Sequence, residues 1–272
     1  MSIWQEENSL AKAFWEKGIV EDCPIYDMHG HMGSHNGIYF KRCEAPDMVA
    51  HMRRIGVRRL VFSHHHALGE PSFRNEKVRD ICAEYPDILR MYAGINPHYP
   101  ENIREDLAKF DSWRPYVVGL KFLADYHAVP VSDPKCEYAL SFANERKLPV
   151  LFHTWGGSPF DGYTEMRKVA DKYPDIIMFV GHSLHGDWDN AAKLVKEAPG
   201  KVYLELTALP GLYQILEKLT GSVGSERLLY GTDLPWFDEY QVVSGVLSAR
   251  ISDDDKRNIL YRNVENLLGK DW

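Results

Sequence analysis

Two histidines stand two residues apart in the segment IYDMHGH, residues 25–31. Because side chains alternate across a β-strand, His29 and His31 would point to the same side and present two imidazoles to one metal ion. Histidine nitrogen is the commonest metal donor in proteins, and Asp27 or a backbone carbonyl can accept a hydrogen bond from the second ring nitrogen. The simpler interpretation is that these are two polar residues at a strand end. The choice between this interpretation and a metal site depends on the rest of the chain.

Further polar side chains end apolar runs elsewhere in the chain. Lys121 ends one such run, His153 and His182 end two others, and Asp233 follows the last one. In a barrel of parallel strands the chemistry lies at the C-terminal ends of the strands, where these residues would meet. Chance can place one histidine there, but several at equivalent ends, in a chain with 12 histidines, indicate a common site.

The elements that would position these residues are short apolar runs that alternate with longer polar segments of helical spacing. The runs predict strands at residues 25–29, 59–63, 89–95, 117–122, 150–153, 176–180, 202–206 and 228–230. The other segments predict helices at residues 8–18, 46–55, 76–85, 103–110, 136–146, 163–173, 188–196, 212–218, 238–249 and 253–268. Strands alternating with helices in 272 residues predict an α/β fold, the closed (β/α)₈ TIM barrel with a short N-terminal helix.

An open, doubly wound sheet is the alternative fold. It would normally offer a glycine-rich turn after the first strand, but residues 29–37 (HGHMGSHNG) lack the order GxGxxG, so dinucleotide binding is poorly supported. No Pro/Gly/Ser-rich linker or break in composition divides the chain, and residues 1–272 are therefore expected to form a single domain.

Composition narrows the classes of partner. A formal charge of −7, a pI near 5.9 and the lack of a dense Lys/Arg run argue against nucleic acid and anionic membranes. The first residues lack the basic and apolar parts of a secretory signal, and no apolar run is long enough to span a bilayer, so a cytoplasmic location is expected. The four cysteines form no CxxC pair, which argues against a thiolate zinc site.

At DMHGH, LFHT, VGHS and YGTDLPW the sequence resembles the amidohydrolase superfamily. The resemblance is specific to its amidohydrolase-related branch, which also contains decarboxylases of aminocarboxymuconate semialdehyde and of resorcylate, and it covers nearly the whole chain. It implies that His29, His31 and His153 ligate one divalent metal ion, with Asp233 as a carboxylate ligand or near neighbour. His182 would then be the acid/base residue.

Three imidazoles and one carboxylate suit zinc, with manganese, iron or cobalt as alternatives. A metal ion lowers the pKa of its bound water to about 7, and a histidine or aspartate nearby can exchange the proton. Simpler roles are a core histidine for His153, a supporting residue for His182 and a helix cap for Asp233. His185 competes with His182 as the acid/base residue.

Lys121 has two interpretations. In binuclear members of the superfamily a lysine on the fourth strand is carbamylated and bridges two metals. The simpler role, which we favour, is an ion pair with a carboxylate such as Glu205 or a contact with a substrate anion.

Other polar and aromatic residues would line the mouth of the barrel. His98 follows the third strand and can bind an acidic group of a substrate, while Trp155 and Trp236 can wall the pocket or simply pack. The triplet at residues 64–66 (HHH) is interpreted as a solvated loop, with substrate contact as the alternative.

Three functions follow. The first is a metal-dependent hydrolase that attacks a small-molecule amide, lactone or ester through metal-activated water. The alternative is a nonoxidative decarboxylase of an aromatic or unsaturated acid, which an arginine or histidine that clamps a second carboxylate would favour; Arg42 is a weak candidate. A binding protein without catalysis would show gaps in the ligand set, and none is seen. A small-molecule substrate is expected in each enzyme, and the resemblance also suggests a homodimer.

Overall fold

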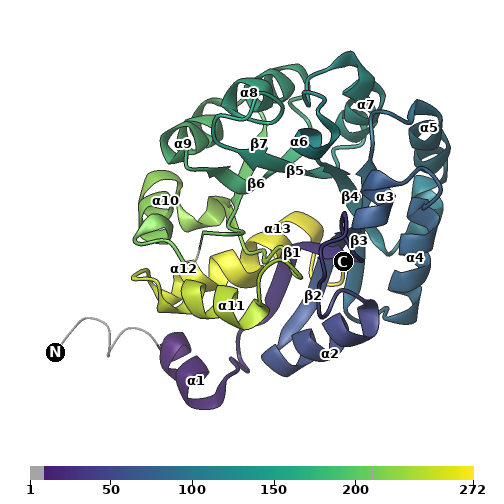
Figure 1. Ribbon diagram of the computed structural model, residues 1–272. Helices are drawn as coiled ribbons and strands as arrows, with labels where there is room; N and C mark the ends of the chain where they lie inside the picture. The colour runs from purple at the N-terminus through teal and green to yellow at the C-terminus, as the bar shows by residue number, and fades with distance from the viewer. Residues whose placement is uncertain (1–8, 210) are drawn as a thin grey trace.

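Eight parallel strands form one sheet in the order in which they occur along the chain. The computed structural model describes residues 9–209 and 211–272. The strands are β1 (Ile25–Met32), β2 (Val57–His64), β3 (Leu89–Ile95), β4 (Val117–Phe122), β5 (Pro149–Trp155), β6 (Ile177–His185), β7 (Lys201–Glu205) and β8 (Leu228–Leu229). Figure 1 shows the sheet curled into a cylinder inside a ring of helices.

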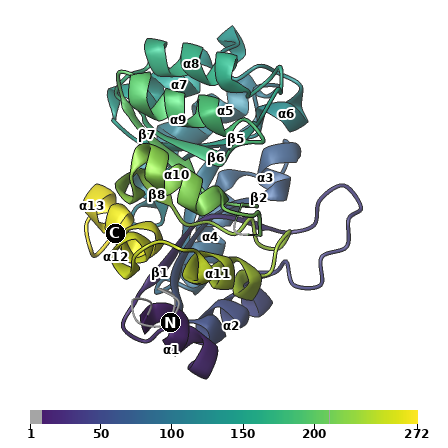
Figure 2. The same cartoon turned by 90° about the vertical axis from the view of Figure 1, so that its left-hand side faces the viewer.

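The helices that cover the strands are α2 (Ala45–Ile55), α4 (Asn75–Glu84), α5 (Pro100–Lys109), α7 (Glu137–Glu145), α8 (Tyr163–Lys172), α9 (Trp188–Glu197), α10 (Ile215–Val223) and α11 (Glu239–Ser248). Shorter pieces are α1 (Ser9–Lys17), α3 (His65–Gly69), α6 (Ala124–His127), α12 (Asp253–Arg257) and α13 (Asn263–Leu268), the last two joined by a π-helical turn at Asn258–Arg262. The chain between β1 and α2 stands out from the barrel as a long loop (Figure 2).

The barrel closes between β1 and the segment that follows β8. The N–H of Met28 donates to the carbonyl of Tyr230 at 3.0 Å, and the N–H of His31 donates to the carbonyl of Leu234 at 2.6 Å. The buried Asp27 adds a side-chain link, because it accepts hydrogen bonds from the N–H of Thr232 at 3.1 Å and from its hydroxyl at 2.5 Å. The two ends of the sheet are thereby held in register beside the predicted metal ligands.

Both faces of the strands are buried, as expected for a parallel sheet covered by helices. One cluster of side chains lies between the sheet and the helices, and a second, smaller one contains Met28, Val61, Tyr92, Leu151 and Phe179 from β1, β2, β3, β5 and β6. Packed side chains therefore fill the barrel on the side away from its mouth. The mouth is left for polar residues.

The predicted TIM barrel is confirmed, and the predicted strands all occur with ends that differ by at most five residues. Residue 8, the predicted start of the first helix, lies outside the described residues, and α1 begins at Ser9. The single helix predicted at 253–268 is broken by the π-helical turn. Two short helices, α3 and α6, were not predicted because four or five residues are too few to show a periodic pattern.

None of the helices within residues 9–209 and 211–272 combines the length and apolar character that a membrane crossing requires.

Gly119 tests how tightly the barrel is packed. A Cβ added to this residue of β4 would lie 1.9 Å from the carbonyl oxygen of Pro149 on β5, so the two backbones must separate in Gly119→Ala. We expect a loss of about 3 kcal/mol in the free energy of unfolding, measured with urea. The control is Gly221→Ala on the exposed face of α10, where an added Cβ meets no atom within 4 Å and about 0.5–1 kcal/mol should be gained. Equal stability of the two variants would contradict the packing.

Candidate metal centre

Three buried side chains converge at the mouth of the barrel. One donor atom from each of His29, His31 and Asp233 lies within 4.8 Å of the other two. Oδ1 of Asp233 is 3.1 Å from Nε2 of His31 and 3.4 Å from Nε2 of His29. The alternation of β1 places the two imidazoles on one side, and the N–H of Asp233 donates to the carbonyl of His29 at 2.7 Å, which fixes the carboxylate beside them.

Glu205, at the end of β7, sets the orientation and tautomer of His29. Nδ1–H of His29 donates to Oε2 of Glu205 at 2.7 Å, and both side chains are fully buried. Burial and then the charge of Lys121 hold the pKa of His29 well below its usual range, so the ring is neutral. A neutral ring with its proton on Nδ1 presents the Nε2 lone pair, the form that binds a metal ion.

His31 is held in the same way by different partners. Its Nδ1 lies 3.2 Å from the hydroxyl of Ser63, and its ring stacks on His65 with the centroids 4.6 Å apart. His65 donates from Nδ1 to the carbonyl of Gly33 at 2.8 Å and accepts at Nε2 from the indole N–H of Trp236 at 3.3 Å. His65 is therefore a supporting residue that fixes the plane of the His31 ring.

The arrangement of lone pairs shows that the site fits a cation. Oδ1 of Asp233 is buried without a hydrogen-bond partner, and it faces two imidazole nitrogens that carry lone pairs. Burial raises the pKa of Asp233, but His29, His182 and Lys121 outweigh it and bring the pKa below its usual value, so the group is a carboxylate. Three acceptors at this separation repel one another unless a positive charge lies between them. Imidazole and carboxylate are suitable ligands for a divalent metal ion.

Lys121 contacts the same nitrogen that would bind the metal. Its Nζ donates to Nε2 of His29 at 2.9 Å from a fully buried position on β4. Burial lowers the pKa of Lys121 to about 8, an effect that Asp233 and Glu205 oppose. Among the described residues, no carboxylate forms an ion pair with Lys121, so Glu205 holds His29 rather than the lysine.

His153 and His182 face the same space but stand outside the group of three donors. Nδ1–H of His153 donates to Oδ2 of Asp161 at 2.9 Å, which leaves Nε2 free. The rings of His153 and His182 lie 4.8 Å apart, and Nδ1 of His182 is buried without a partner. Burial keeps the pKa of His182 well below its usual range. His153 as a fourth ligand and His182 as the acid/base residue therefore stay predictions.

The backbone at His182 and Asp233 adopts a conformation that side chains rarely take. φ is 59° at His182 and 63° at Asp233, both in the left-handed region. The turn at His182 is held by Glu205, whose Oε2 accepts from the N–H of His182 at 3.3 Å, and by Ser183, whose hydroxyl donates to the carbonyl of Glu205 at 2.8 Å. Such strain concentrates at functional sites, where the surrounding structure holds it in place.

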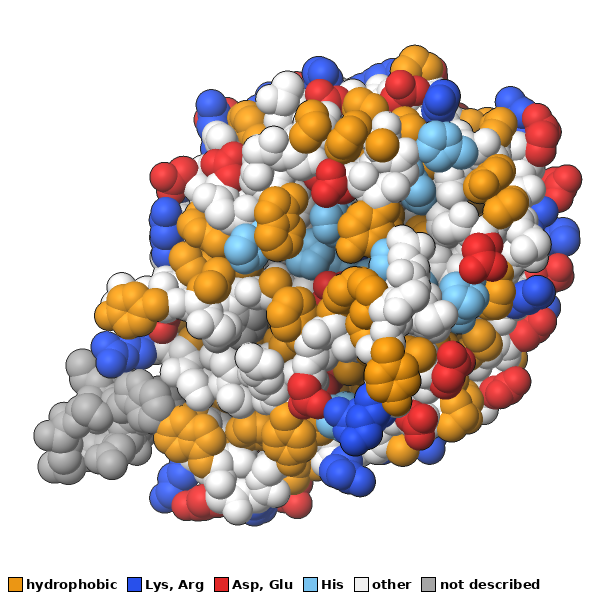
Figure 3. Space-filling model, in the orientation of Figure 1, with side chains coloured by type: hydrophobic (Ala, Val, Ile, Leu, Met, Phe, Trp, Pro, Cys, Tyr) orange, Lys and Arg blue, Asp and Glu red, His pale blue; other side chains and the backbone are white. Residues whose placement is uncertain are grey.

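The site opens into a cavity of about 180 Å³, here called the inner cavity. It is lined by His31, His65, Leu123, Tyr126, His153, Trp155, His182, Ala208, Asp233, Trp236 and Phe237. In the space-filling view, histidine side chains gather near the centre of this face, with hydrophobic side chains around them (Figure 3). A polar floor with aromatic walls suits a small ligand with a charged end and a flat apolar body.

The structure separates the predicted substrate-binding residues. Trp155 and Trp236 line the inner cavity, and His98 lines a second, larger cavity beside it. His185 stacks on Trp155 with ring centroids 4.3 Å apart, and Lys121 lies behind His29, outside the lining of either cavity.

Two parts of the site were missed or misread from the sequence. The solvated loop expected at residues 64–66 is wrong: His64 and His65 are about 5% and 4% exposed, His64 ends β2, and the short helix α3 begins at His65. Glu205 was considered only as a partner of Lys121, although a carboxylate at the end of a strand is a common orienting group for a metal-binding histidine. Asp161 was missed because it lies in a loop, eight residues beyond His153.

A closed barrel with a His–His–Asp group at its C-terminal mouth defines a metal-dependent enzyme of the amidohydrolase type. The family model Amidohydro_2, described as Amidohydrolase, matches residues 26–270. The chain therefore belongs to this amidohydrolase family. No curated protein matches the chain.

Several solved structures share the fold. Dihydroxybenzoic acid decarboxylase from Polaromonas sp. JS666, with bound manganese and the inhibitor 2-nitroresorcinol, is 15% identical with a TM-score of 0.73, and the match covers 90% of this chain and 96% of that one. 5-Carboxyvanillate decarboxylase from Novosphingobium aromaticivorans DSM 12444, complexed with manganese, is 13% identical with a TM-score of 0.70. The match covers 90% of this chain and 96% of that one. An uncharacterised TIM-barrel protein from Bordetella bronchiseptica is 17% identical with a TM-score of 0.74, and the match covers 91% of this chain and 99% of that one.

These comparisons correct the predicted reaction. The matching enzymes described here whose reaction is named are decarboxylases, so the prediction of a hydrolase is wrong and the alternative reaction is supported instead. Zinc as the first choice of metal is not supported, since both decarboxylases contain manganese. A divalent metal site at His29, His31 and Asp233 is retained.

The bond between Glu205 and His29 gives a test of the metal site. Glu205→Gln removes the charge that fixes the His29 tautomer, and we expect manganese affinity to fall about 10–100-fold in isothermal titration calorimetry. Glu137→Gln, an exposed carboxylate on α7, is the control and should bind as the wild type does. Unchanged affinity in Glu205→Gln would show that His29 needs no such partner.

Lys121→Met tests whether the lysine opposes or assists the metal ion. A buried ammonium 2.9 Å from Nε2 of His29 competes with a cation for the same lone pair and repels it, so its removal should raise manganese affinity at least tenfold. Circular dichroism of the variant shows whether the barrel is kept. A fall in affinity would mean that Lys121 supplies a ligand, as a carbamylated lysine does.

Proposed function

We propose that the chain is a nonoxidative, metal-dependent decarboxylase of a small aromatic carboxylic acid. The observation that supports it best is the pairing of the His–His–Asp group with a neighbouring cavity of about 180 Å³ that has aromatic walls. An apolar cavity of roughly 150 Å³ holds a benzene molecule, so the inner cavity is the right size for one substituted ring. Arg42 does not serve as a clamp for a second carboxylate, because its guanidinium pairs with Asp238 at 2.8 Å.

His29, His31 and Asp233 would hold the metal ion, and Nε2 of His153 would be a fourth ligand. Manganese is our first choice, because the two structural relatives named above contain it and because imidazole and carboxylate ligands suit it. When bound, the ion supplies positive charge that orients the carboxylate of the substrate and withdraws electron density from its oxygens.

The residues of the chain supply the proton. The ring carbon that carries the carboxylate takes a proton that His182 delivers. His182 lines the inner cavity beside Asp233, whose carboxylate stabilises the protonated imidazole. The bond from that carbon to the carboxylate then breaks, its electron pair returns to the ring, and CO₂ leaves. Water from solvent restores the proton. Nδ1 of His182 is buried without a hydrogen-bond partner, so this ring can take up and pass on a proton without giving up an existing bond.

Tyr126, Trp155 and Trp236 keep bulk water away from the ring, since all three line the inner cavity. A dry cavity favours release of neutral CO₂ over a solvated carboxylate and strengthens the electrostatic contacts inside it.

CO₂ release tests the proposal directly. Manganese-loaded protein should release CO₂ from 2,6-dihydroxybenzoate or 5-carboxyvanillate, and both His182→Gln and Asp233→Asn should lower kcat by about 100-fold or more. A chelator should abolish the activity, and added manganese should restore it. Glu137→Gln again serves as the control. Absence of CO₂ release from every aromatic acid tried, with a full equivalent of manganese bound, would overturn the proposal.

A further inference from the structure

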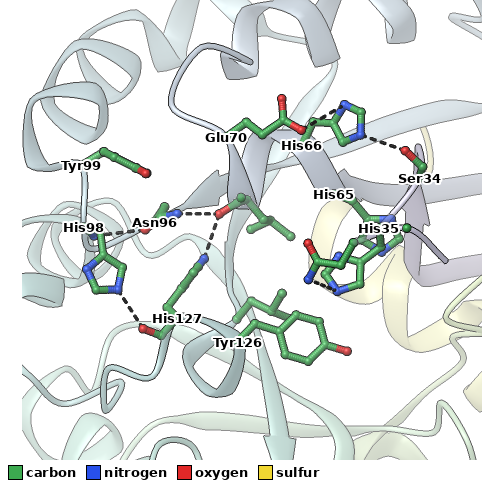
Figure 4. Close-up of a pocket in the computed structure, with 15 residues that line it drawn as sticks. Ser34, His35, His65, His66, Glu70, Asn96, His98, Tyr99, Tyr126 and His127 are labelled. Atoms are coloured by element: carbon green, nitrogen blue, oxygen red, sulfur yellow. Dashed lines mark hydrogen bonds and ion pairs between the residues drawn. The ribbon is translucent and has the colours of Figure 1, made fainter.

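A second cavity of about 550 Å³ adjoins the inner cavity and is called the outer chamber here. It is lined by Ser34, His35, Asn36, Gly37, His65, His66, Leu68, Gly69, Glu70, Asn96, His98, Tyr99, Leu123, Tyr126 and His127. Figure 4 shows these side chains around the space, contributed by the loop after β1, by α3, by α6 and by the segment after β3. The first part of the long β1–α2 loop (residues 34–37) and the short helices α3 and α6 therefore form its walls.

The outer chamber adjoins the reaction site. Its lining shares His65, Leu123 and Tyr126 with that of the inner cavity. The ring of Tyr126 lies 5.1 Å from His35 on one side and 5.7 Å from His153 on the other, so it stands between the two spaces. A ligand that is longer than one ring can therefore extend past Tyr126 while its carboxylate stays at the metal site.

The charge of the lining restricts what such an extension can be. Among the described residues that line the outer chamber there is no lysine or arginine, and Glu70 is its one permanently charged side chain. Burial lowers the pKa of both His35 and His127, which keeps these rings neutral at pH 7. A second carboxylate or a phosphate would meet no fixed positive charge there and would face the carboxylate of Glu70.

The hydrogen bonds of the lining add a preference for donors. Nε2–H of His127 donates to the carbonyl of Leu68 at 2.8 Å, and Nε2–H of His98 donates to the carbonyl of His127 at 2.8 Å. In a neutral imidazole the other nitrogen is then an acceptor. Asn96 is occupied on both sides, by the carbonyl of Leu68 and the N–H of His98. Nδ1 of His98, Nδ1 of His127 and the carboxylate of Glu70 are therefore acceptors for a ligand, and the hydroxyls of Tyr99 and Tyr126 can accept as well as donate.

We infer that the outer chamber is a specificity subsite, which binds the neutral, hydroxyl-bearing distal ring of an aromatic acid whose carboxylate lies in the inner cavity. The inference rests on the proposed function for the reacting end of the substrate. It adds that the preferred substrate has two rings rather than one, and that its second ring carries hydrogen-bond donors and no second anionic group.

Binding of unreactive phenols separates this inference from the reaction. We would titrate manganese-loaded protein with resorcinol, with resorcinol joined through one methylene to a phenol, and with the same two-ring compound carrying a carboxylate in place of the phenol hydroxyl. We expect the two-ring phenol to bind at least tenfold more tightly than resorcinol. The affinity of the carboxylate compound should exceed that of resorcinol by less than threefold.

Gly69→Leu provides the matched variant. Gly69 lines the outer chamber and an added Cβ meets no atom within 4 Å, so a larger side chain can start from this position and take up space in the chamber. In Gly69→Leu the affinity of the two-ring phenol should exceed that of resorcinol by less than threefold. Gly221→Leu, the same exchange at an open position on α10, should keep the tenfold difference. Equal affinity of the wild type for resorcinol and the two-ring phenol, a gain that survives Gly69→Leu, or a preference for the carboxylate compound would each overturn the inference.

The two proposals fail in different ways. If single-ring acids release CO₂ but the two-ring phenol gains no affinity, the specificity subsite alone is refuted. If the two-ring phenol binds more tightly and no aromatic acid releases CO₂, the subsite stands and the decarboxylase does not.

Discussion

The buried carboxylate of Glu205 is the interaction on which the rest of the site depends. Its Oε2 accepts from Nδ1–H of His29 at 2.7 Å and from the N–H of His182, and its Oε1 accepts from the N–H and hydroxyl of Thr207 at 2.7 and 2.5 Å. Burial raises its pKa to about 7 even though the bonds from Thr207 and His182 lower it, so these bonds favour the charged form that burial disfavours. One residue of β7 thereby holds a ligand of β1 and the turn of β6.

The barrel makes this arrangement possible because each strand brings its last residues to the same rim. β1 contributes both imidazoles, and Asp27 of the same strand accepts from the N–H of His29 and from Thr232, the residue before Asp233. Two buried acidic side chains, Glu205 and Asp27, therefore fix the site from behind, while His31 and Asp233 line the cavity. Loss of either would leave several buried donors without partners, which costs more than the bonds themselves contribute.

The architecture could be predicted from the sequence because alternation of apolar runs with helical segments is a strong, repeated signal. The ligands His29, His31 and Asp233 were also predicted, since the strand ends of a barrel are known positions. Long-range partners could not be predicted in the same way. Asp161 accepts a hydrogen bond from His153 across a loop whose path depends on tertiary packing, and no local sequence pattern predicts this contact.

The triplet at residues 64–66 shows a different limit. A run of three histidines predicts a solvated segment on polarity alone, yet His65 is buried because its flat ring stacks on His31 and both of its nitrogens find partners. The burial of His65 therefore depends on His31, Gly33 and Trp236, which are distant from it in the sequence. Sequence polarity therefore underestimates how readily a neutral imidazole enters a core when both nitrogens are satisfied.

The charges of the site bear on how the proposed substrate would bind. The site holds the Asp233 carboxylate, the Lys121 ammonium next to His29, and a place for a cation among three acceptors. A divalent ion bound there would attract the aromatic carboxylate that we propose as the substrate, which enters as an anion. The CO₂ that the proposed reaction forms is neutral, so the same charge would not attract it. In the proposed reaction the cavity would therefore bind the substrate through the group that is removed.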